Sequence, residues 1–383
     1  MKALRNYIDK IKPNVEKGGK FHYLHSTFEA FETFLFVPKT VTKKGSHIRD
    51  AIDLKRTMFM VVVALIPAFL FGTWNVGYQH NLSIGAEADI ITNFFYGLWY
   101  VLPLIVVSYV VGLGTEFIFA QLRGHEVNEG FLVSGFLIPL IVPVTTPLWM
   151  VAIATVFAVV IGKEVFGGTG MNIMNPALLA RAFLFFAYPS QMSGDKVWIA
   201  EKADAFSGAT PMGLLMTATD KVELPSVADA FFGFIPGSVG ETSAFAILIG
   251  AVILLFTGIA SWRVMFSVFA GGYLMGWVFN LVGSNVYMSD VPAYYHLILG
   301  GFAFGAVFMA TDPVTASQTN TGKYIYGLLI GIMAVLIRVL NPAYPEGMML
   351  AILLLNVFAP TIDYYVVQSN IKRRVKRLKK IAA

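Results

Sequence analysis

The 383-residue sequence contains no cysteine and little charge. Without thiols the chain can form no disulfide, no thiolate-bound metal site and no cysteine-ligated iron–sulfur cluster. Charged residues make up 13% of the chain and apolar residues 56%, and the mean hydropathy is +0.67. A soluble globule needs a surface much richer in charge, so the composition predicts an integral membrane protein.

Histidines are also scarce, and no apolar leader opens the sequence. Of the six histidines, only His22 and His25 stand at helical spacing, so neither a structural zinc nor a bis-histidine haem is expected. The first 20 residues are charged, which does not fit a cleaved signal peptide. We find no Ser-His-Asp or metal-ligand constellation, so we expect no catalytic side chains, and redox chemistry must come from a cofactor.

Apolar runs recur along the whole chain and predict an all-α polytopic protein with about ten transmembrane helices. The expected spans are 57–74, 94–118, 130–143, 148–162 and 176–188, then 242–259, 264–282, 293–310, 324–340 and 346–366. This divides the chain into an N-terminal arm (1–56), a first five-helix half (57–189), a polar insertion (190–241), a second half (242–366) and a basic tail (367–383).

The basic residues predict the orientation in the membrane. An even number of spans places both termini on one side, and the basic run that begins at Lys372 assigns that side to the cytoplasm of a bacterial inner membrane. The expected cytoplasmic loops carry Arg123, Lys163, Arg263 and Lys323, whereas the short outward turns near 77–92, 144–147, 283–291 and 341–345 hold no Lys or Arg. The insertion then faces outward. A basic run beside a membrane helix fixes orientation, so no nucleic-acid partner is expected.

A weak internal repeat relates the two halves. Gly135-Phe136 matches Gly301-Phe302, and Asn175-Pro176-Ala177 matches 341–343, both at an offset of 166 residues. Thr311-Asp312-Pro313 follows the second pair as Thr145-Thr146-Pro147 follows the first. Because five helices per half is an odd number, the second half must be inverted in the membrane, as in many proteins that move a small solute.

Two polar stretches stand out. Residues 163–176 read KEVFGGTGMNIMNP, in which Asn175 can cap the following helix. Alternatively, Gly168 and Gly170 permit close backbone approach, while the amides of Asn172 and Asn175 offer the donor and acceptor that an isoalloxazine edge requires. No Lys-Ser or Lys-Thr follows the glycines, so this is not a nucleotide P-loop.

The second stretch, DAFSGATPMG at 204–213, lies inside the insertion. Ser207, Gly208 and Ala209 are small residues that let a bulky ligand approach the hydroxyl of Thr210, and Pro211 stiffens the exit. A phosphate ester on Thr210 would need these surroundings. An ordinary polar turn has the same composition.

Three acidic residues lie at the ends of expected spans: Glu116, Asp312 and Asp363. Asp312 follows a helix break, where it can act as a cap or hold a cation. Carboxylates at span ends are often simply solvated, so both interpretations of each acid stay open.

The motifs together resemble a known family. The stretch 204–210 is similar to the acceptor motif Asp-x-x-Ser/Thr-Gly-Ala-Thr, on whose last threonine a flavin transferase esterifies FMN. Further matching segments are FVPKTVTKKGSHIRDAIDLKRTM, GKEVFGGTG, MNPAL, RAFLFFAYP, FMATDPVTAS and NVFAPTIDYYVV with its basic tail. They cover nearly the whole chain and resemble the B-subunit family of sodium-translocating NADH:quinone reductases. The related D subunits of Rnf-type ferredoxin:NAD reductases share the threonine motif but lack so substantial an N-terminal arm.

This resemblance implies covalent FMN on Thr210, noncovalent riboflavin near Asn172 and Asn175, and a quinone substrate, ubiquinone or menaquinone, near Gly112 and Leu113. Family members can carry adjacent glycines at that last place, where this chain reads Gly-Leu-Gly at 112–114. The three acidic residues match acids linked to sodium handling. Implied partners are an outward-facing flavoprotein and an NADH-oxidising subunit of a multi-subunit membrane complex. A cofactor-free channel or transporter is the alternative, which leaves the Thr210 motif unexplained.

Overall fold

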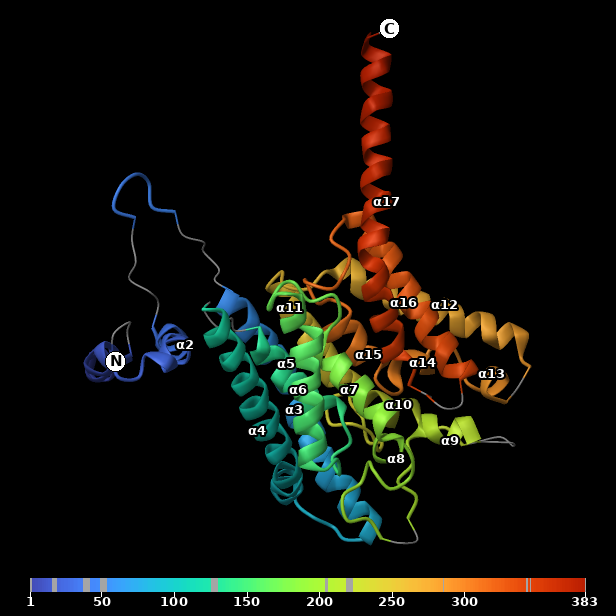
Figure 1. The fold of residues 1–383 in the computed structure, drawn as a ribbon. Helices are drawn as coiled ribbons and strands as arrows, with labels where there is room; N and C mark the ends of the chain where they lie inside the picture. The colour runs from blue at the N-terminus through green and yellow to red at the C-terminus, as the bar shows by residue number, and fades with distance from the viewer. Residues whose placement is uncertain are drawn as a thin grey trace.

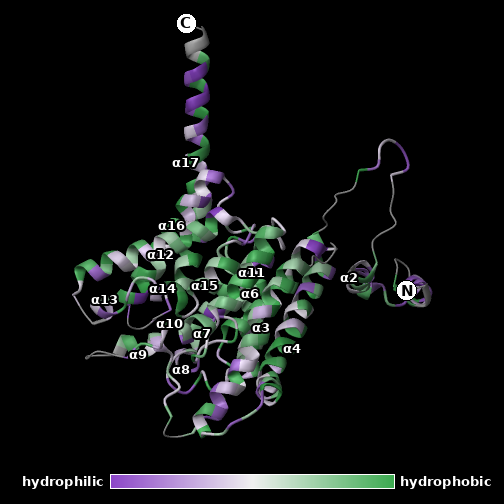
Figure 2. Cartoon of the chain, turned by 180° about the vertical axis from the view of Figure 1, so that it is seen from behind, coloured by the Kyte–Doolittle hydropathy of each residue, from purple (hydrophilic) through white to green (hydrophobic). Residues whose placement is uncertain are grey.

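The structure is a computed structural model that describes residues 2–15, 19–36, 42–48, 54–124, 130–203, 206–217, 223–284, 286–341, 344 and 346–382. Within these ranges every regular element is a helix, so the all-α, polytopic prediction is confirmed (Figure 1). Along the helices of the bundle most residues are apolar, whereas the part of the last helix that projects from the bundle is rich in polar residues (Figure 2).

The first half comprises α3 (Leu54–Ile84), α4 (Ile90–Arg123), α5 (Phe131–Ile141), α6 (Leu148–Gly162) and α7 (Pro176–Ala187). The second comprises α11 (Ala244–Phe256), α12 (Trp262–Val282), α15 (Phe302–Phe304) with the π-helix Gly305–Met309, α16 (Asn320–Leu340) and α17 (Met348–Ala382). Among the described residues, six helices are long and apolar enough to cross a membrane: α3, α4, α6 together with the turn that continues it to Phe166, α12, α16 and α17. The others are shorter, and α3 and α4 extend beyond the predicted bounds.

The remaining helices lie in the arm, in the insertion and in the loops that follow α6 and α12. The arm forms α1 (Lys2–Val15), a 3-10 turn (His22–Leu24) and α2 (His25–Leu35), and the insertion forms α8 (Pro189–Met192), α9 (Pro211–Thr217) and α10 (Val227–Phe232). A 3-10 turn (Glu164–Phe166) follows α6, and α13 (Val286–Asp290) follows α12. The Phe31 ring of α2 packs 6.1 Å from the Phe117 ring of α4, which attaches the arm to the bundle.

The predicted single helix at 293–310 is wrong. It is divided into α14 (Tyr295–Ile298), α15 and the π-helix, and Gly300 stands between them with a left-handed φ of +62°. The guanidinium of the fully buried Arg338 accounts for the break, because it donates to the carbonyl oxygens of His296 (2.7 Å) and Leu299 (3.2 Å). Those carbonyls would otherwise be left unpaired in an apolar interior.

The predicted end of the last span at 366 does not end a helix. Instead α17 runs on through the basic tail to Ala382 and projects from the bundle (Figure 1). The tail contains no Gly or Pro, and Lys and Arg are strong helix formers, so nothing in the sequence stops the helix.

The two halves share most of their helix contacts. In the first, α3 and α4 contact α5, α4 contacts α6, and α6 contacts α7; in the second, α11 and α12 contact the π-helix, α12 contacts α16, and α16 contacts α17. The halves differ at their first helix: α3 packs on α4, whereas α11 packs on α3 rather than on α12. Glycines make the closest approaches possible: a Cβ at Gly97 would lie 1.8 Å from the Thr73 carbonyl oxygen, and one at Gly271 would lie 2.3 Å from that of Leu328.

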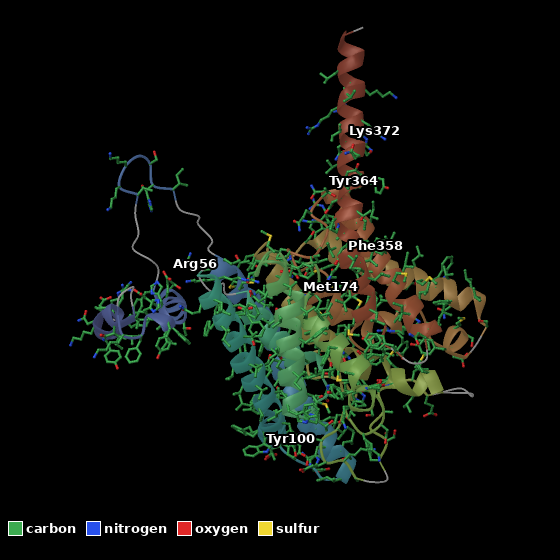
Figure 3. The ribbon with its side chains drawn as sticks, viewed as in Figure 1. Arg56, Tyr100, Met174, Phe358, Tyr364 and Lys372 are labelled. Carbon is green, nitrogen blue, oxygen red and sulfur yellow. The ribbon has the colours of Figure 1, made fainter. Side chains whose placement is uncertain are left out.

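Corresponding helix breaks lie near opposite ends of the bundle. Thr145, after α5, donates to the carbonyl oxygen of Val197 in the insertion (2.9 Å), whereas Asp312, after the π-helix, lies beside Asn175. Figure 3 shows that Arg56 and Lys372 lie toward one end and Tyr100 toward the other. These placements fit an inverted repeat. The inversion and the count of ten spans stay predictions.

Candidate functional site

Thr210 opens helix α9 within the insertion. Its side-chain oxygen accepts a hydrogen bond from the backbone amide of Gly213 (3.1 Å), so the residue also caps this short helix. Thr210 is half-buried, whereas Ser207 is exposed and Gly208 is buried. A Cβ at Gly208 would lie 2.6 Å from the Asp195 carbonyl oxygen, which explains the requirement for glycine there. Asp204 and Ala205, the start of the motif, lie outside the described residues.

Asp195 holds the loop that leads to Thr210. Its Oδ1 accepts from the Ser207 hydroxyl (3.0 Å) and from the amides of Gly208 (2.6 Å) and Ala209 (3.1 Å). Lys202 donates to the other carboxylate oxygen (2.5 Å) and to the Phe206 carbonyl (2.7 Å). The Lys202 ammonium, together with these hydrogen bonds, lowers the pKa of Asp195 to about 2. The carboxylate is therefore ionised, and the loop is braced, at any pH above about 4.

A pocket opens beside Thr210, with a free volume of about 1030 Å³ including its mouth. We call it the Thr210 pocket. Its walls come from α7, the insertion and the segment before α17: Arg181, Phe185, Met192, Ser193, Gly194, Asp195, Trp198, Ser207, Ala209, Thr210, Gly213, Leu214, Met216, Tyr344 and Glu346. Aromatic and methionine side chains alternate here with a few polar groups, which is the usual lining of a site for a flat organic ligand.

Buried charges form the floor of the Thr210 pocket. Arg181 pairs with Glu346, and its Nη1 lies 3.5 Å from Oε2 of Glu241. All three side chains are at most 11% exposed. Two smaller cavities adjoin the same charges: one reaches Thr210 and Gly300, the other runs between Ile141 and Met349 into the bundle.

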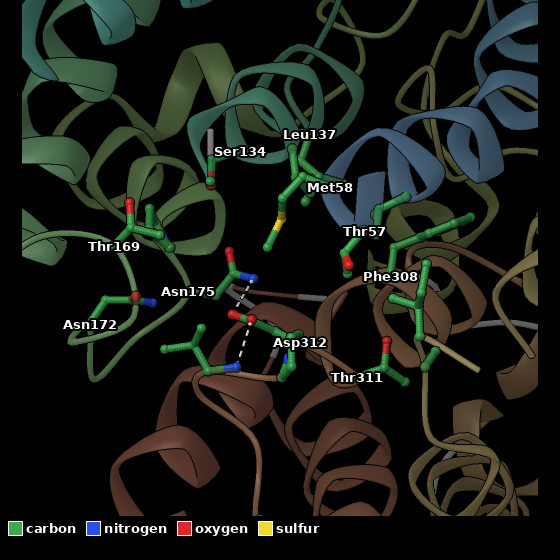
Figure 4. Close-up of a pocket in the computed structure, with 18 of the residues that line it drawn as sticks. Thr57, Met58, Ser134, Leu137, Thr169, Asn172, Asn175, Phe308, Thr311 and Asp312 are labelled. Carbon is green, nitrogen blue, oxygen red and sulfur yellow. Dashed lines mark hydrogen bonds between the residues drawn. The ribbon is translucent and has the colours of Figure 1, made fainter. Parts of the chain in front are cut away.

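The second site surrounds Asn175 and is drawn in Figure 4. This Asn175 pocket encloses a cavity of about 90 Å³ and, with its open mouth included, a space of about 790 Å³. It is lined from both halves by Thr57, Met58, Val61, Gly130, Val133, Ser134, Leu137, Lys163, Thr169, Asn172, Asn175, Pro176, Leu254, Ile259, Ala260, Phe308, Thr311, Asp312, Pro313 and Val314. Thr169 and Asn172 lie on one side of it and Phe308 on the other, where Thr57 and Thr311 lie beside the Phe308 ring (Figure 4).

Asn175 has two structural partners and also faces the pocket. Its side-chain oxygen accepts from the amides of Ala177 (3.0 Å) and Leu178 (3.3 Å), which confirms the predicted cap of α7. Its amide nitrogen donates to Asp312 (3.5 Å) across the pocket, while Asn172 donates to the Met174 carbonyl (3.2 Å). Both predicted amides therefore lie in one pocket.

Gly168 and Gly170 do not line the Asn175 pocket. They have left-handed φ values of +97° and +91°, a conformation that L side chains rarely adopt. Their structural role is to turn the chain after the 3-10 helix so that Asn172 and Asn175 reach the pocket. The predicted close approach of a ligand to these two glycines remains untested.

Asp312 and Asp363 both organise the loop before α16. Asp312 accepts from the Val314 amide (3.1 Å) and the Thr315 hydroxyl (2.9 Å). Asp363, on α17, accepts from the hydroxyls of Ser317 (2.7 Å) and Thr319 (2.6 Å) and from the amides of Gln318 and Thr319. Both acids therefore accept hydrogen bonds from the same loop, residues 312–319.

Glu116 lies on α4 near the same end of the bundle. It is buried and paired with the buried Lys163, which also lines the Asn175 pocket. Next to them, Arg123 bonds the Glu164 carboxylate (3.2 Å) and carbonyl (2.8 Å). The three predicted acids therefore surround one region, but Glu116 reaches the pocket through Lys163 rather than directly.

Gly112 and Leu113 lie on α4 and line neither pocket. A Cβ at Gly112 would lie 1.9 Å from the Phe131 ring, so this glycine has a packing role. Leu113 is half-buried. The arm approaches this part of α4 through Phe31 and Phe117, and quinone binding here stays a prediction.

Comparison with known proteins identifies the family. Residues 41–372 match the NQR2, RnfD, RnfE family. The chain belongs to this family. It is 52% identical to a protein from Chromohalobacter salexigens, over 98% of this chain and 97% of the relative, and 51% identical to one from Ectopseudomonas mendocina, over 98% and 99%. A protein from Azotobacter vinelandii is 49% identical over 98% and 99%.

All three relatives are named as the B subunit of a Na(+)-translocating NADH-quinone reductase. The resemblance found in the sequence is therefore confirmed. Because the relatives align with nearly the full length of this chain, the chain is a membrane subunit of an enzyme complex of this kind.

Sequence reasoning missed four residues that the structure adds to these sites. Asp195 and Lys202 brace the Thr210 loop, Lys163 neutralises Glu116, and Tyr344 lines the Thr210 pocket. Each lies far along the chain from its partner or on an irregular segment, where no periodic pattern marks it. Asp195, only 12 residues before Ser207, offered the one usable signal, an acid followed by a lysine near a Ser-Gly turn.

Replacement of Asp195 by Ala should loosen the Thr210 loop, because two amides and a hydroxyl lose their shared acceptor. Since a hydrogen bond to a charged group contributes about 1.5–3 kcal/mol, we expect amide hydrogen exchange in the peptide that contains Gly208 and Ala209 to accelerate by about tenfold or more. The exposed Glu223, replaced by Ala in the same insertion, provides the matched control. Equal exchange rates in the wild type and both variants would contradict the bracing role.

Proposed function

We propose that this chain passes electrons from covalent FMN on Thr210, through riboflavin in the Asn175 pocket, to a quinone, and couples this transfer to outward sodium transport. The observation that carries the proposal is the position of the two pockets: the Thr210 pocket borders the insertion, and the Asn175 pocket lies toward the end that carries Arg56 (Figure 3). The chain has no cysteine, and its described residues include no group of side chains that could hold a metal ion, so two separated sites for organic redox cofactors would explain how electrons cross the bundle.

The Thr210 pocket fits a phosphate-linked flavin. Small residues surround the Thr210 hydroxyl, and its oxygen can still accept the Gly213 amide after esterification, because an ester oxygen keeps a lone pair. The pocket's enclosed cavity of about 380 Å³ lies in the range of sites for drug-sized ligands, about 300–1,000 Å³. Trp198 and Phe185 offer apolar surface for a ring system. When bound, the flavin supplies one-electron and two-electron redox chemistry.

The polar and apolar groups around the Asn175 pocket suit a second flavin without a phosphate, but the enclosed cavity of about 90 Å³ has to widen to admit the ring. Asn172, Asn175 and Thr169 provide donors and acceptors, whereas Met58, Leu137 and Phe308 provide apolar surface (Figure 4). Lys163 is the one basic residue among the described residues of the lining, and it is paired with Glu116 rather than placed to bind a phosphate. A riboflavin ring matches this distribution.

Sodium coupling would use the acids at this end of the bundle. Asp312 lies in the Asn175 pocket, Asp363 holds the same loop, and Glu116 is connected through Lys163. An electron that enters the pocket adds negative charge near these carboxylates and raises their affinity for a cation. The electrons would come from an outward-facing flavoprotein of the complex, which an NADH-oxidising subunit supplies, and both termini would lie in the cytoplasm of a bacterial inner membrane.

Two alternative functions are weaker. A cofactor-free transporter would use the inverted halves but gives no reason for the braced Thr210 loop. An Rnf-type D subunit would keep the flavins and replace NADH and quinone by ferredoxin and NAD. The relatives that align with 98% of this chain, arm included, carry the quinone-reductase name and favour the first proposal.

Thr210→Ala should remove the covalent flavin, because the phosphoester loses its oxygen. The measurement is in-gel flavin fluorescence of the full chain produced in a host that has the flavin transferase. Ser207→Ala, which removes another hydroxyl of the same loop, is the matched control and should retain a fluorescent band. A fluorescent Thr210→Ala band would contradict the attachment, and a colourless wild-type protein would favour the transporter.

Asp363→Asn and Asp312→Asn should lower the sodium stimulation of quinone reduction by the assembled complex more than they lower its yield. The amide keeps much of the hydrogen bonding to the 312–319 loop while it removes the charge that binds a cation. Initial rates as a function of sodium concentration measure the effect, and Asp229→Asn, in the insertion, is the control. An unchanged sodium dependence in both variants would remove these acids from the ion path.

A further inference from the structure

Tyr344 is a buried phenol that faces the Thr210 pocket without a partner. Its side chain is only 3% exposed, and its hydroxyl has no hydrogen-bond partner among the described residues. Burying a hydroxyl without a partner costs about 1–3 kcal/mol, so a buried donor of this kind calls for a ligand. Burial also raises the pKa of the Tyr344 phenol above its usual range, so the hydroxyl keeps its proton and remains a donor.

The surroundings fix Tyr344 in this position. Its ring packs edge-on against Phe185, with ring centroids 4.6 Å apart and planes at 72°. Phe185 lies on α7, one turn beyond Arg181, so both side chains face the same pocket. The pocket thus presents a donor and a cation together, next to an aromatic wall.

Arg181 is held rigidly behind this donor. Glu346 and Glu241 bind its guanidinium from two sides, and Glu346 also belongs to the pocket wall. A second buried cation, Arg338, donates to the Glu346 carbonyl oxygen (3.3 Å), so two arginines and two glutamates lie together and their formal charges cancel. The cluster therefore carries no net negative charge that would repel an additional negative charge in the pocket.

We propose that Tyr344 and Arg181 bind the pyrimidine end of the flavin ring attached to Thr210. The Tyr344 hydroxyl donates a hydrogen bond to a ring carbonyl oxygen, and the Arg181 guanidinium stabilises the negative charge that the ring gains on reduction. Trp198 and Phe185 take the apolar part of the ring. This inference rests on the proposed function, since it requires flavin on Thr210, and it assigns these residues the role of setting the reduction potential.

The test uses the full-length chain, loaded by the flavin transferase and purified in detergent. In-gel fluorescence reports attachment, and a spectroelectrochemical titration reports the midpoint potential, with Thr210→Ala as the background that identifies the transition of the covalent flavin. In Tyr344→Phe we expect an unchanged fluorescent band and a lower midpoint potential. A tenfold weaker preference for the reduced ring corresponds to a shift of about 59 mV for one electron.

Two further variants complete the test. Tyr188→Phe removes a phenol at the end of α7 whose ring packs on Trp149 (5.5 Å), outside the pocket lining, and should titrate like the wild type. The double variant Arg181→Met, Glu346→Gln removes a cation together with its partner, so no buried charge is left unbalanced, and it should lower the potential at least as far as Tyr344→Phe does.

Three results would overturn the inference alone, and a fourth would overturn the proposed function as well. A fluorescent Tyr344→Phe protein with the wild-type potential would show that the ring lies elsewhere. So would an equal shift in Tyr188→Phe, or a double variant that titrates like the wild type. If the wild-type chain itself carries no covalent flavin, the proposed function fails, and the inference fails with it for that separate reason.

Discussion

Backbone groups that leave a helix inside an apolar body must find hydrogen-bond partners, and this requirement shapes both sites of the protein. A membrane-spanning helix satisfies its own amides and carbonyls, whereas a broken one depends on side chains. Here Asn175 caps α7, Asp312 and Asp363 hold the loop before α16, and Arg338 bonds the carbonyls released before α15. Two of these side chains, Asn175 and Asp312, also line the Asn175 pocket.

The breaks explain why the charged residues occur in balanced groups. Each buried charge in an apolar interior needs a partner, since an unpaired one is strongly destabilising. Lys163 pairs with Glu116 near the Asn175 pocket, and Arg181 pairs with two glutamates near the Thr210 pocket. The charge of a redox cofactor beside such a group changes each time the cofactor is reduced or oxidised. In the account proposed here, that change is what connects electron transfer to cation movement.

Much of this arrangement could be predicted from the sequence, because the spacing of apolar residues, the capping residues and the glycines determine structure through neighbouring residues. The helices, the cap at Asn175 and the loop of Thr210 follow from neighbouring residues. The division of the 293–310 segment could not be predicted, because its cause is Arg338, some 40 residues along the chain. The same limit hid Tyr344, which reaches the Thr210 pocket only through tertiary packing. It also hid the continuous helix α17, since the basic tail was interpreted by its charge rather than by its helix propensity.

The central claim is that one chain holds two flavins in two separate pockets, with the quinone beyond the second. An experimental density map of the assembled complex tests it most directly. The account predicts density continuous with the Thr210 side chain that extends toward Tyr344 and Arg181, and a second ring in the Asn175 pocket between Asn172 and Phe308. A map in which Thr210 carries no added density, or in which lipid or packed side chains fill the Asn175 pocket, would contradict it.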